Sequence, residues 1–258
     1  MAWQSLNCSG STSAIAHKKN KIMKKNYFKG ALVLFTALTV MSSCKKDSES
    51  SQNAGLKLND AQAVTIVPGA SAVAITDGGG TISRDANNTA CQSYHVLNFF
   101  QGTINPTPAD PHDRATTYYF NLFDNKGGNS GAYDLVFTGT ANGDVSAVSG
   151  GQLAYVDKAY CDVVASDFSL TNVRTIIGKE NTINFPTPPS TRYTGPGWYN
   201  YDFSVHILQA LTGRTLIYKA VDGTLFKIQL ESLYENGTPN AASAATNFPY
   251  FKFKYAEL

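Results

Sequence analysis

No stretch of this sequence is apolar for long enough to cross a membrane as a helix. The longest such run, GALVLFTALTV at 30–40, has eleven residues, whereas a spanning helix needs about 20. Lysines 24 and 25 precede the run, and small residues follow it up to Cys44. A positive start, a short apolar centre and small residues before a cleavage point are typical of a secretory signal. We therefore expect a signal sequence and not a membrane-spanning helix.

The residues Met41-Ser42-Ser43-Cys44 resemble a lipobox, the site at which bacteria attach lipid to a cysteine and cut before it, with Met41 where Leu is usual. We expect Cys44 to carry the lipid anchor, and residues 1–43 to be the signal region. A signal that starts at Met23 is complete by itself, so Met23 is the predicted true start. The alternative is an ordinary secretory signal with a chance cysteine at its end.

Behind Cys44 the chain lacks methionine and any basic run. Met1, Met23 and Met41 all lie upstream, and the 43 upstream residues hold six lysines and no acidic residue, so the formal charge falls from +2 to −4. A mildly acidic domain argues against nucleic acid as a partner. Residues 44–60 are polar and predict a flexible tether. In it, Asp47 and Glu49 resemble the export signal of Bacteroidetes surface lipoproteins, although a plain soluble linker fits equally.

Cysteine is scarce as well. Apart from Cys44, the mature chain holds Cys91 and Cys161, which lack the CxxC or Cys/His clustering of a zinc site. An oxidising envelope permits a disulfide between them, and two separate buried thiols remain the alternative.

What the mature chain does contain is short runs rich in Val, Ile, Thr, Tyr and Phe between Gly, Pro, Asn and Asp breaks; examples are 63–67, 116–123 and 152–156. No long segment has helical spacing. The pattern predicts one all-β domain over residues 61–258, an antiparallel sheet or sandwich.

The clearest local element lies near the C-terminus. Runs 215–220 and 224–230 flank Asp222-Gly223, a pair that suits a hairpin turn of type I′. Alternation places Phe226, Ile228 and Leu230 in the core, with Lys227 and Gln229 pointing away. The last strand repeats the pattern, with aromatic residues 251, 253 and 255 inward and lysines 252 and 254 outward.

The same segment carries a family resemblance. GWYNYD (197–202), then His206, GRTLIYKAVDGTLFKIQLESLY (213–234) and FKFKY (251–255) resemble in order the C-terminal signature of the HmuY family. Weaker matches upstream, among them TTYYFNLFDNK and AYDLVFTG, extend the resemblance to roughly residues 115–258. It implies a β-rich Bacteroidetes lipoprotein of the outer membrane, exposed at the cell surface. Characterised members bind haem there and deliver it to an outer-membrane receptor, which predicts haem and a TonB-dependent haem receptor as partners.

Family members hold haem iron by paired His or paired Met, and the mature chain has no Met. The candidates are His206, which lies closest to the family's ligand-bearing segment, with His112 and His95. Alternation in YDFSVHIL places His206 on a strand face with Ser204 and Leu208, so a partly exposed strand histidine is the alternative reading. Residues 162–196, where the family has its other ligand, contain neither His nor Met.

Aromatic residues around the Gly-Trp block offer another route. Tyr199 and Tyr201 are candidates for a phenolate ligand, and Trp198 with both tyrosines would suit stacking on a porphyrin or a sugar. A non-haem binding or adhesion module for a glycan or an envelope protein is therefore the alternative function. We find no HExxH motif, phosphate-cradling Gly loop or paired carboxylates, and do not expect an enzyme.

Overall fold

The computed structural model describes residues 64–102, 116–128, 133–148, 150–186, 195–239 and 248–258, all within one unit of the chain, 51–258. These residues form fifteen strands and five short 3₁₀ turns. The all-β prediction is confirmed. The strands form three sheets, and one strand pair, in the smallest sheet, is parallel. No helix in the described part of the chain is long and apolar enough to cross a membrane.

Sheet A is the largest, with eight strands in the order β1-β2-β3-β15-β14-β13-β8-β9. Its strands are β1 (Val73–Ala74), β2 (Gly79–Arg84), β3 (Tyr94–Phe100), β15 (Phe251–Glu257), β14 (Leu225–Ser232), β13 (Thr215–Lys219), β8 (Gln152–Val156) and β9 (Val173–Arg174). Every neighbouring pair is antiparallel.

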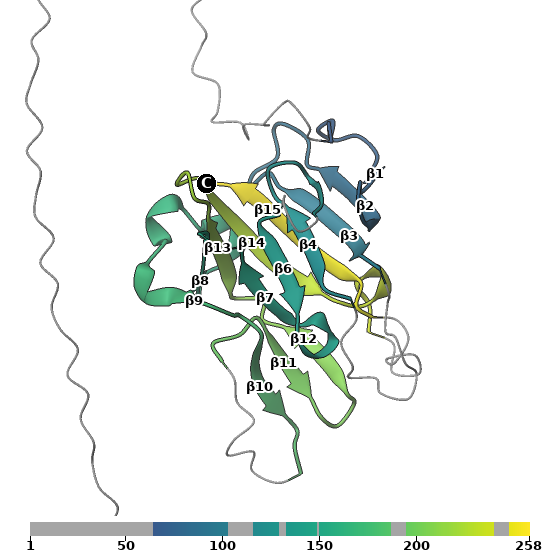
Figure 1. The fold of residues 1–258 in the computed structure, drawn as a ribbon, viewed down its shortest axis with the longest axis vertical. Helices are drawn as coiled ribbons and strands as arrows, with labels where there is room; N and C mark the ends of the chain where they lie inside the picture. The colour runs from purple at the N-terminus through teal and green to yellow at the C-terminus, as the bar shows by residue number, and fades with distance from the viewer. Residues whose placement is uncertain (1–63, 103–115, 129–132, 149, 187–194, 240–247) are drawn as a thin grey trace, which may run out of the picture. The chain divides into compact units, whose positions relative to one another are not determined.

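The two smaller sheets supply the second layer and the lower end of the domain in Figure 1. Sheet B is β5 (Lys126–Gly127), β4 (Tyr118–Asn121), β6 (Leu135–Thr138) and β7 (Asp144–Ala147) in that order. Sheet C is β10 (Lys179–Ile183), β11 (Tyr199–Asp202) and β12 (Ile207–Ala210). The 3₁₀ turns are η1 (Thr140–Asn142), η2 (Tyr160–Asp162), η3 (Ala165–Asp167), η4 (Leu170–Asn172) and η5 (Glu235–Gly237).

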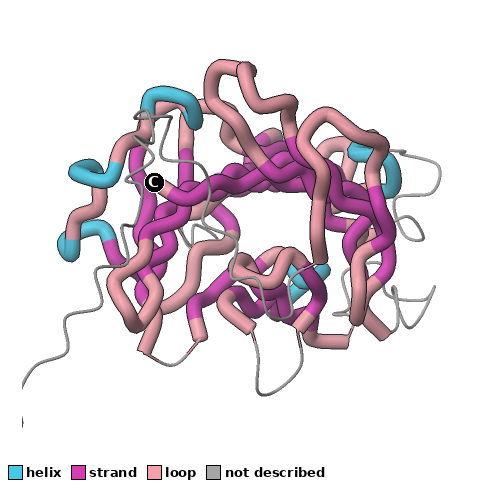
Figure 2. The backbone as a smooth tube through the Cα atoms, turned by 90° about the horizontal axis from the view of Figure 1, so that it is seen from above, coloured by secondary structure: helices cyan, strands magenta, loops and turns pink. Residues whose placement is uncertain are grey.

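Sheets A and B face each other across an aromatic core, and Figure 2 shows the two layers edge-on. Phe120 of sheet B meets Phe99 and Phe253 of sheet A with ring centroids 5.2 and 5.0 Å apart, and Phe137 lies 4.3 Å from Phe251. Each of these five rings is at most 1% exposed. Edge-to-face and tilted pairs of this kind add to the stabilisation from burial. Two of the five rings, Phe251 and Phe253, come from the last strand, whose inward face alternation predicted.

The C-terminal hairpin is confirmed, but its turn is of a different type. Strands β13 and β14 pair as expected, and Gly223 N–H donates to Ala220 O at 3.0 Å while Ala220 N–H donates to Thr224 O at 2.8 Å. Gly223 has φ +95°, and Asp222 is not in the left-handed region. A type I′ turn needs positive φ at both central residues, so the prediction was wrong. The bonding fits a type I turn closed by a glycine bulge.

Alternation predicted the inner face of β14 correctly and its outer face only in part. Phe226, Ile228 and Leu230 are at most 4% exposed, and the inward aromatics of β15 at most 1%. Lys227, expected to point into water, is 8% exposed. The reason is tertiary: the segment that contains η2 contacts β14 and covers this part of the outer face.

The cysteine question that the sequence left open has an answer in the structure. Cys91 and Cys161 form a disulfide with Cα atoms 5.3 Å apart and a sequence separation of 70. A loop of that size corresponds to about 4 kcal/mol in the chain-entropy estimate. The bond joins the start of β3 to η2.

One predicted strand does not form. Residues 64–67 of the run 63–67 have no strand structure, although Ile66 is 2% exposed and belongs to the core. Pro68 and Gly69 follow at once in a turn, and Val64 N–H donates to Asp124 O in a loop instead of a ladder. The apolar run therefore contributes a buried residue to the core but does not form a strand.

Candidate ligand-binding site

Sheet C, η1 and the start of β7 enclose a pocket of about 440 Å³. This volume lies in the range of small-molecule sites. The pocket is lined by Thr140, Ala141, Asp144, Ile176, Gly178, Lys179, Tyr199, Tyr201 and Leu208. Two tyrosines, a carboxylate and a lysine thus face a space with aliphatic walls.

A chain reversal before β7 builds one wall. Gly139, Ala141 and Asn142 have φ of +76°, +53° and +52°. The side chain of Asn142 stabilises this reversal by donating a hydrogen bond to Thr116 O at 2.7 Å. Two backbone hydrogen bonds of 3.0 and 2.9 Å then join Val145 to Ile177. They bring the segment before β10 against β7.

Asp144 is the carboxylate of the pocket. Its oxygens occupy the space that a side chain at Gly139 or Gly178 would need, because a Cβ there would lie 2.2 or 2.0 Å from them. Burial raises the pKa of Asp144, and nearby Lys179 opposes that shift. Among the described residues no hydrogen bond reaches this carboxylate. A half-buried acceptor with a perturbed pKa at a pocket wall is a candidate for ligand contact.

In the Gly-Trp block, Trp198 packs inside the fold, whereas Tyr199 lines the pocket. Trp198 is 2% exposed, and its indole N–H donates to Gly143 O at 2.7 Å. The prediction that Trp198 stacks on a ligand was therefore wrong, because its ring is enclosed. Tyr199 is 7% exposed and reaches the pocket, and burial raises the pKa of its phenol.

Tyr201, which lines the pocket, pairs with His206, which does not line it. The phenol oxygen of Tyr201 lies 2.7 Å from Nδ1 of His206. Tyr201 lines the pocket and is half-buried, and burial raises its pKa. His206 is exposed and comes from the turn between β11 and β12. Phe203 also contacts the imidazole, with ring centroids 5.2 Å apart.

The placement of His206 on a strand face was wrong. Residues 203–206 form the hairpin turn, and His206 has φ +55°. Asp202 makes the turn, because one carboxylate oxygen accepts Ser204 N–H at 3.0 Å and its hydroxyl at 2.7 Å. These bonds lower the pKa of Asp202. Such Asx geometry competes with strand extension, which apolar alternation does not reveal.

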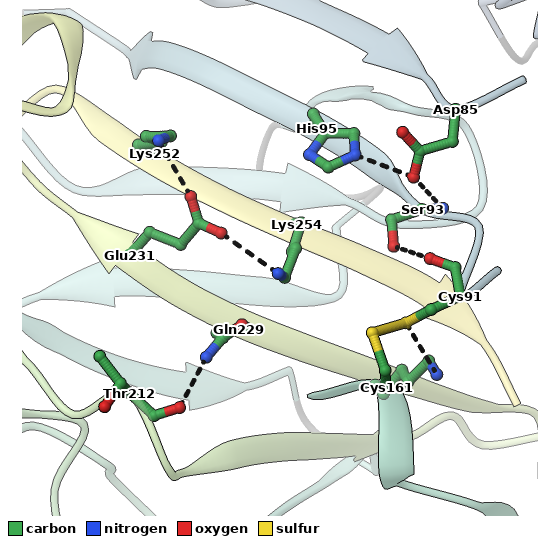
Figure 3. Close-up of polar contacts among 11 residues, drawn as sticks. Asp85, Cys91, Ser93, His95, Cys161, Thr212, Gln229, Glu231, Lys252 and Lys254 are labelled. Carbon is green, nitrogen blue, oxygen red and sulfur yellow. Dashed lines mark hydrogen bonds and ion pairs between the residues drawn. A yellow bond between two sulfur atoms is a disulfide. The ribbon is translucent and has the colours of Figure 1, made fainter. Parts of the chain in front are cut away.

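His95 lies on sheet A and does not line the pocket. It is in β3, paired in register with Lys254, and Nε2 lies 3.1 Å from Asp85 Oδ2 (Figure 3). The described histidines therefore do not converge. His112 and Cys44 lie outside the described residues. Within them no group of three or more His, Cys, Asp or Glu could hold a metal ion.

An ion network that the sequence did not suggest fixes sheet C to sheet A. Arg214 donates to Glu180 of β10 at 2.5 Å, to Gly197 O at 2.8 Å and to Asp157 at 2.7 Å. Its guanidinium also lies 4.8 Å from the centre of the Tyr155 ring. The three acceptors come from distant parts of the chain, so local sequence carried no signal for them.

Comparison with known proteins gives little further guidance. No family model and no curated protein matches the chain. A solved structure titled "putative lipoprotein", from Bacteroides fragilis NCTC 9343, matches with 18% identity and a TM-score of 0.35, over 64% of this chain and 88% of that one.

Proposed function

We propose that this protein is an exported, HmuY-type lipoprotein, held to the outer membrane through Cys44, whose β domain binds haem for iron acquisition. The signal sequence and the residues before Cys44 support export and lipidation. The Cys91–Cys161 disulfide adds independent support, since such bonds persist in oxidising compartments outside the cytosol. The role is binding and relay to a TonB-dependent receptor, without catalysis.

The observation that carries the haem assignment is Tyr201 at the pocket wall with His206 hydrogen-bonded to its phenol from outside the lining. Tyrosine phenolate is an established axial ligand of haem iron. Two ligands on opposite sides of an iron have donor atoms about 4 Å apart, taking ~2 Å for each bond. The 2.7 Å between Tyr201 Oη and His206 Nδ1 is too short for that. We therefore assign Tyr201 as the ligand and His206 as its hydrogen-bonding partner.

The pair also supplies the proton chemistry that a phenolate ligand needs. Burial raises the pKa of Tyr201 and so disfavours the phenolate. With Nδ1 unprotonated, His206 would be placed to accept the phenol proton of Tyr201. A bound iron would favour the deprotonated form of such a ligand. Ile176 and Leu208 provide aliphatic walls for a macrocycle, and Lys179 offers a cation to its carboxylates.

Haemin titration of the purified protein, followed by the Soret band, tests this function. A tyrosine-ligated site should give saturable binding and a high-spin ferric spectrum. His206→Ala should weaken binding about tenfold, the order expected for loss of a partner that orients a metal ligand. Tyr119→Phe serves as the control, since the Tyr119 ring packs at a tilt against Tyr133 and does not line the pocket. A low-spin spectrum, or His206→Ala with wild-type affinity, would contradict the assignment.

A second candidate function follows from Asp144. An acceptor without a described hydrogen bond, in a pocket that two tyrosines also line, suits the hydroxyl donors of a glycan. In that case haemin binds without saturation. A glycan array would then show binding that Asp144→Asn weakens.

Lipidation is tested separately. Intact-mass analysis of the native protein should show an acylated cysteine 44 at the N-terminus. A Cys44→Ala protein still held tightly in membranes would contradict the anchor.

A further inference from the structure

The outer face of sheet A contains a second group of reactive side chains, none of which lines the pocket. It includes the disulfide between Cys91 and Cys161, and Figure 3 shows this bond together with the Asp85–His95 and Glu231–Lys254 pairs. The two halves of the bond differ in environment. Cys161 is exposed, whereas Cys91 is half-buried.

Lys227 gives the two sulfurs of the disulfide different electrostatic environments. Its ammonium lies 3.9 Å from Cys91 Sγ and 4.8 Å from the centre of the Tyr160 ring. Lys227 is 8% exposed and has no ion pair among the described residues. Burial lowers the pKa of Lys227, although Asp162 opposes that shift. Lys254, whose ammonium lies 4.8 Å from the centre of the same Tyr160 ring, lowers it further. A buried ammonium held 3.9 Å from a sulfur would be stabilised by an anion at that sulfur.

Reduction of the disulfide creates such an anion. A thiolate beside a lysine is stabilised, so its thiol pKa falls and it becomes the better leaving group. Cys91 supplies the sulfur next to Lys227, and Cys161 is the more exposed residue of the pair. An incoming thiolate can therefore reach Cys161, and Cys91 is the better leaving group.

We propose that Cys91–Cys161 is a directional thiol-exchange site: an incoming thiolate attacks Cys161, and Cys91 departs as a thiolate paired with Lys227. In the first step a bond forms between the attacking sulfur and Cys161 Sγ, and the bond between the two cysteines breaks. A second thiolate then attacks the external sulfur and releases Cys161. Two thiols thus become one external disulfide, and their two electrons reduce the protein disulfide. The partner class is a small thiol or a dithiol protein of the envelope.

Glutathione identifies the attacked sulfur directly. The oxidised protein is incubated with reduced glutathione, quenched in acid and treated with N-ethylmaleimide, and its peptides are mapped by mass spectrometry. Glutathione should be found on Cys161 and maleimide on Cys91, in about tenfold excess over the reverse pattern, because the lower-pKa thiol leaves faster. Glutathione on Cys91, equal labelling of both, or no mixed disulfide would overturn the proposal.

A variant tests the role of Lys227. Lys227→Met conserves volume and should slow reduction of the disulfide about three- to tenfold, since the leaving thiolate loses its cation. Lys252→Met is the matched control, because Lys252 is on the same face but pairs with Glu231 at 3.2 Å. The unfolding midpoint of each variant shows whether it folds. Equal reduction rates in folded Lys227→Met and wild type would overturn the role of Lys227, whatever the outcome of the haemin titration.

Discussion

On the inner face of sheet A, Phe99, Phe251 and Phe253 are at most 1% exposed and each ring touches several others. In sheet C, the half-buried Tyr201 and the exposed His206 meet through one 2.7 Å hydrogen bond beside a pocket. Many small apolar contacts hold the first region, so its stability is shared among residues. A few polar contacts shape the second, so single substitutions there should change binding more than stability.

The largest effect should come from the core. Phe226→Ala removes a ring that is 4% exposed and packs 4.9 Å from Phe123, and it should cost about 3–5 kcal/mol as a large-to-small core change. Gln229→Ala, on the outer face of the same strand, should be nearly silent. Urea unfolding measures both. A cost for Phe226→Ala below that of Gln229→Ala would contradict the core described here.

The next largest effect should distinguish a carboxylate of the core, Asp134, from the carboxylate of the pocket, Asp144. Asp134 accepts Leu122 N–H at 2.7 Å and Tyr218 O–H at 3.2 Å inside the core. Asp134→Ala leaves both donors buried without an acceptor and should cost about 2–4 kcal/mol. Asp144→Ala removes no hydrogen bond of the described residues and should cost less than about 1 kcal/mol. Equal costs in urea unfolding would show that the pocket carboxylate is structural.

A smaller effect concerns pH. Burial raises the pKa of Asp144 above its unfolded value, so the native state holds the proton more tightly. The free energy of unfolding should therefore fall as pH rises from the unfolded pKa, about 4, through the raised native pKa. In Asp144→Asn this contribution to the pH slope should vanish. Unfolding curves of wild type and variant across pH 3.5–7 measure the difference, and identical slopes would count against a buried acid.

The sequence predicted the parts of the fold that follow from alternation and turn chemistry. Strands β8, β14 and β15 and the hairpin at 221–224 lie where their apolar pattern placed them. The burial of Lys227 was not predictable, because η2, which packs over it, lies more than 60 residues earlier in the chain. Local patterns specify which residues face a core, but not which distant loops fold over the opposite face.

The candidate site was predictable by residue type and less so by geometry. Tyr199 and Tyr201 were named from the Gly-Trp block, and both line the pocket. Asp144 and Lys179 were missed, since each is an ordinary charge until the Val145–Ile177 bonds bring their segments together. His206 was named, but its turn position depends on the Asp202–Ser204 bonds, which override the apolar alternation.

The most direct measurement of the central claim is the haemin affinity and spectrum of Tyr201→Phe. This change removes one oxygen from a half-buried side chain and should leave stability within about 0.5 kcal/mol of wild type. If Tyr201 holds the iron, the high-spin tyrosinate spectrum should disappear and affinity should fall at least tenfold, while Tyr119→Phe keeps both. A folded Tyr201→Phe protein with the wild-type Soret spectrum and affinity would contradict the account.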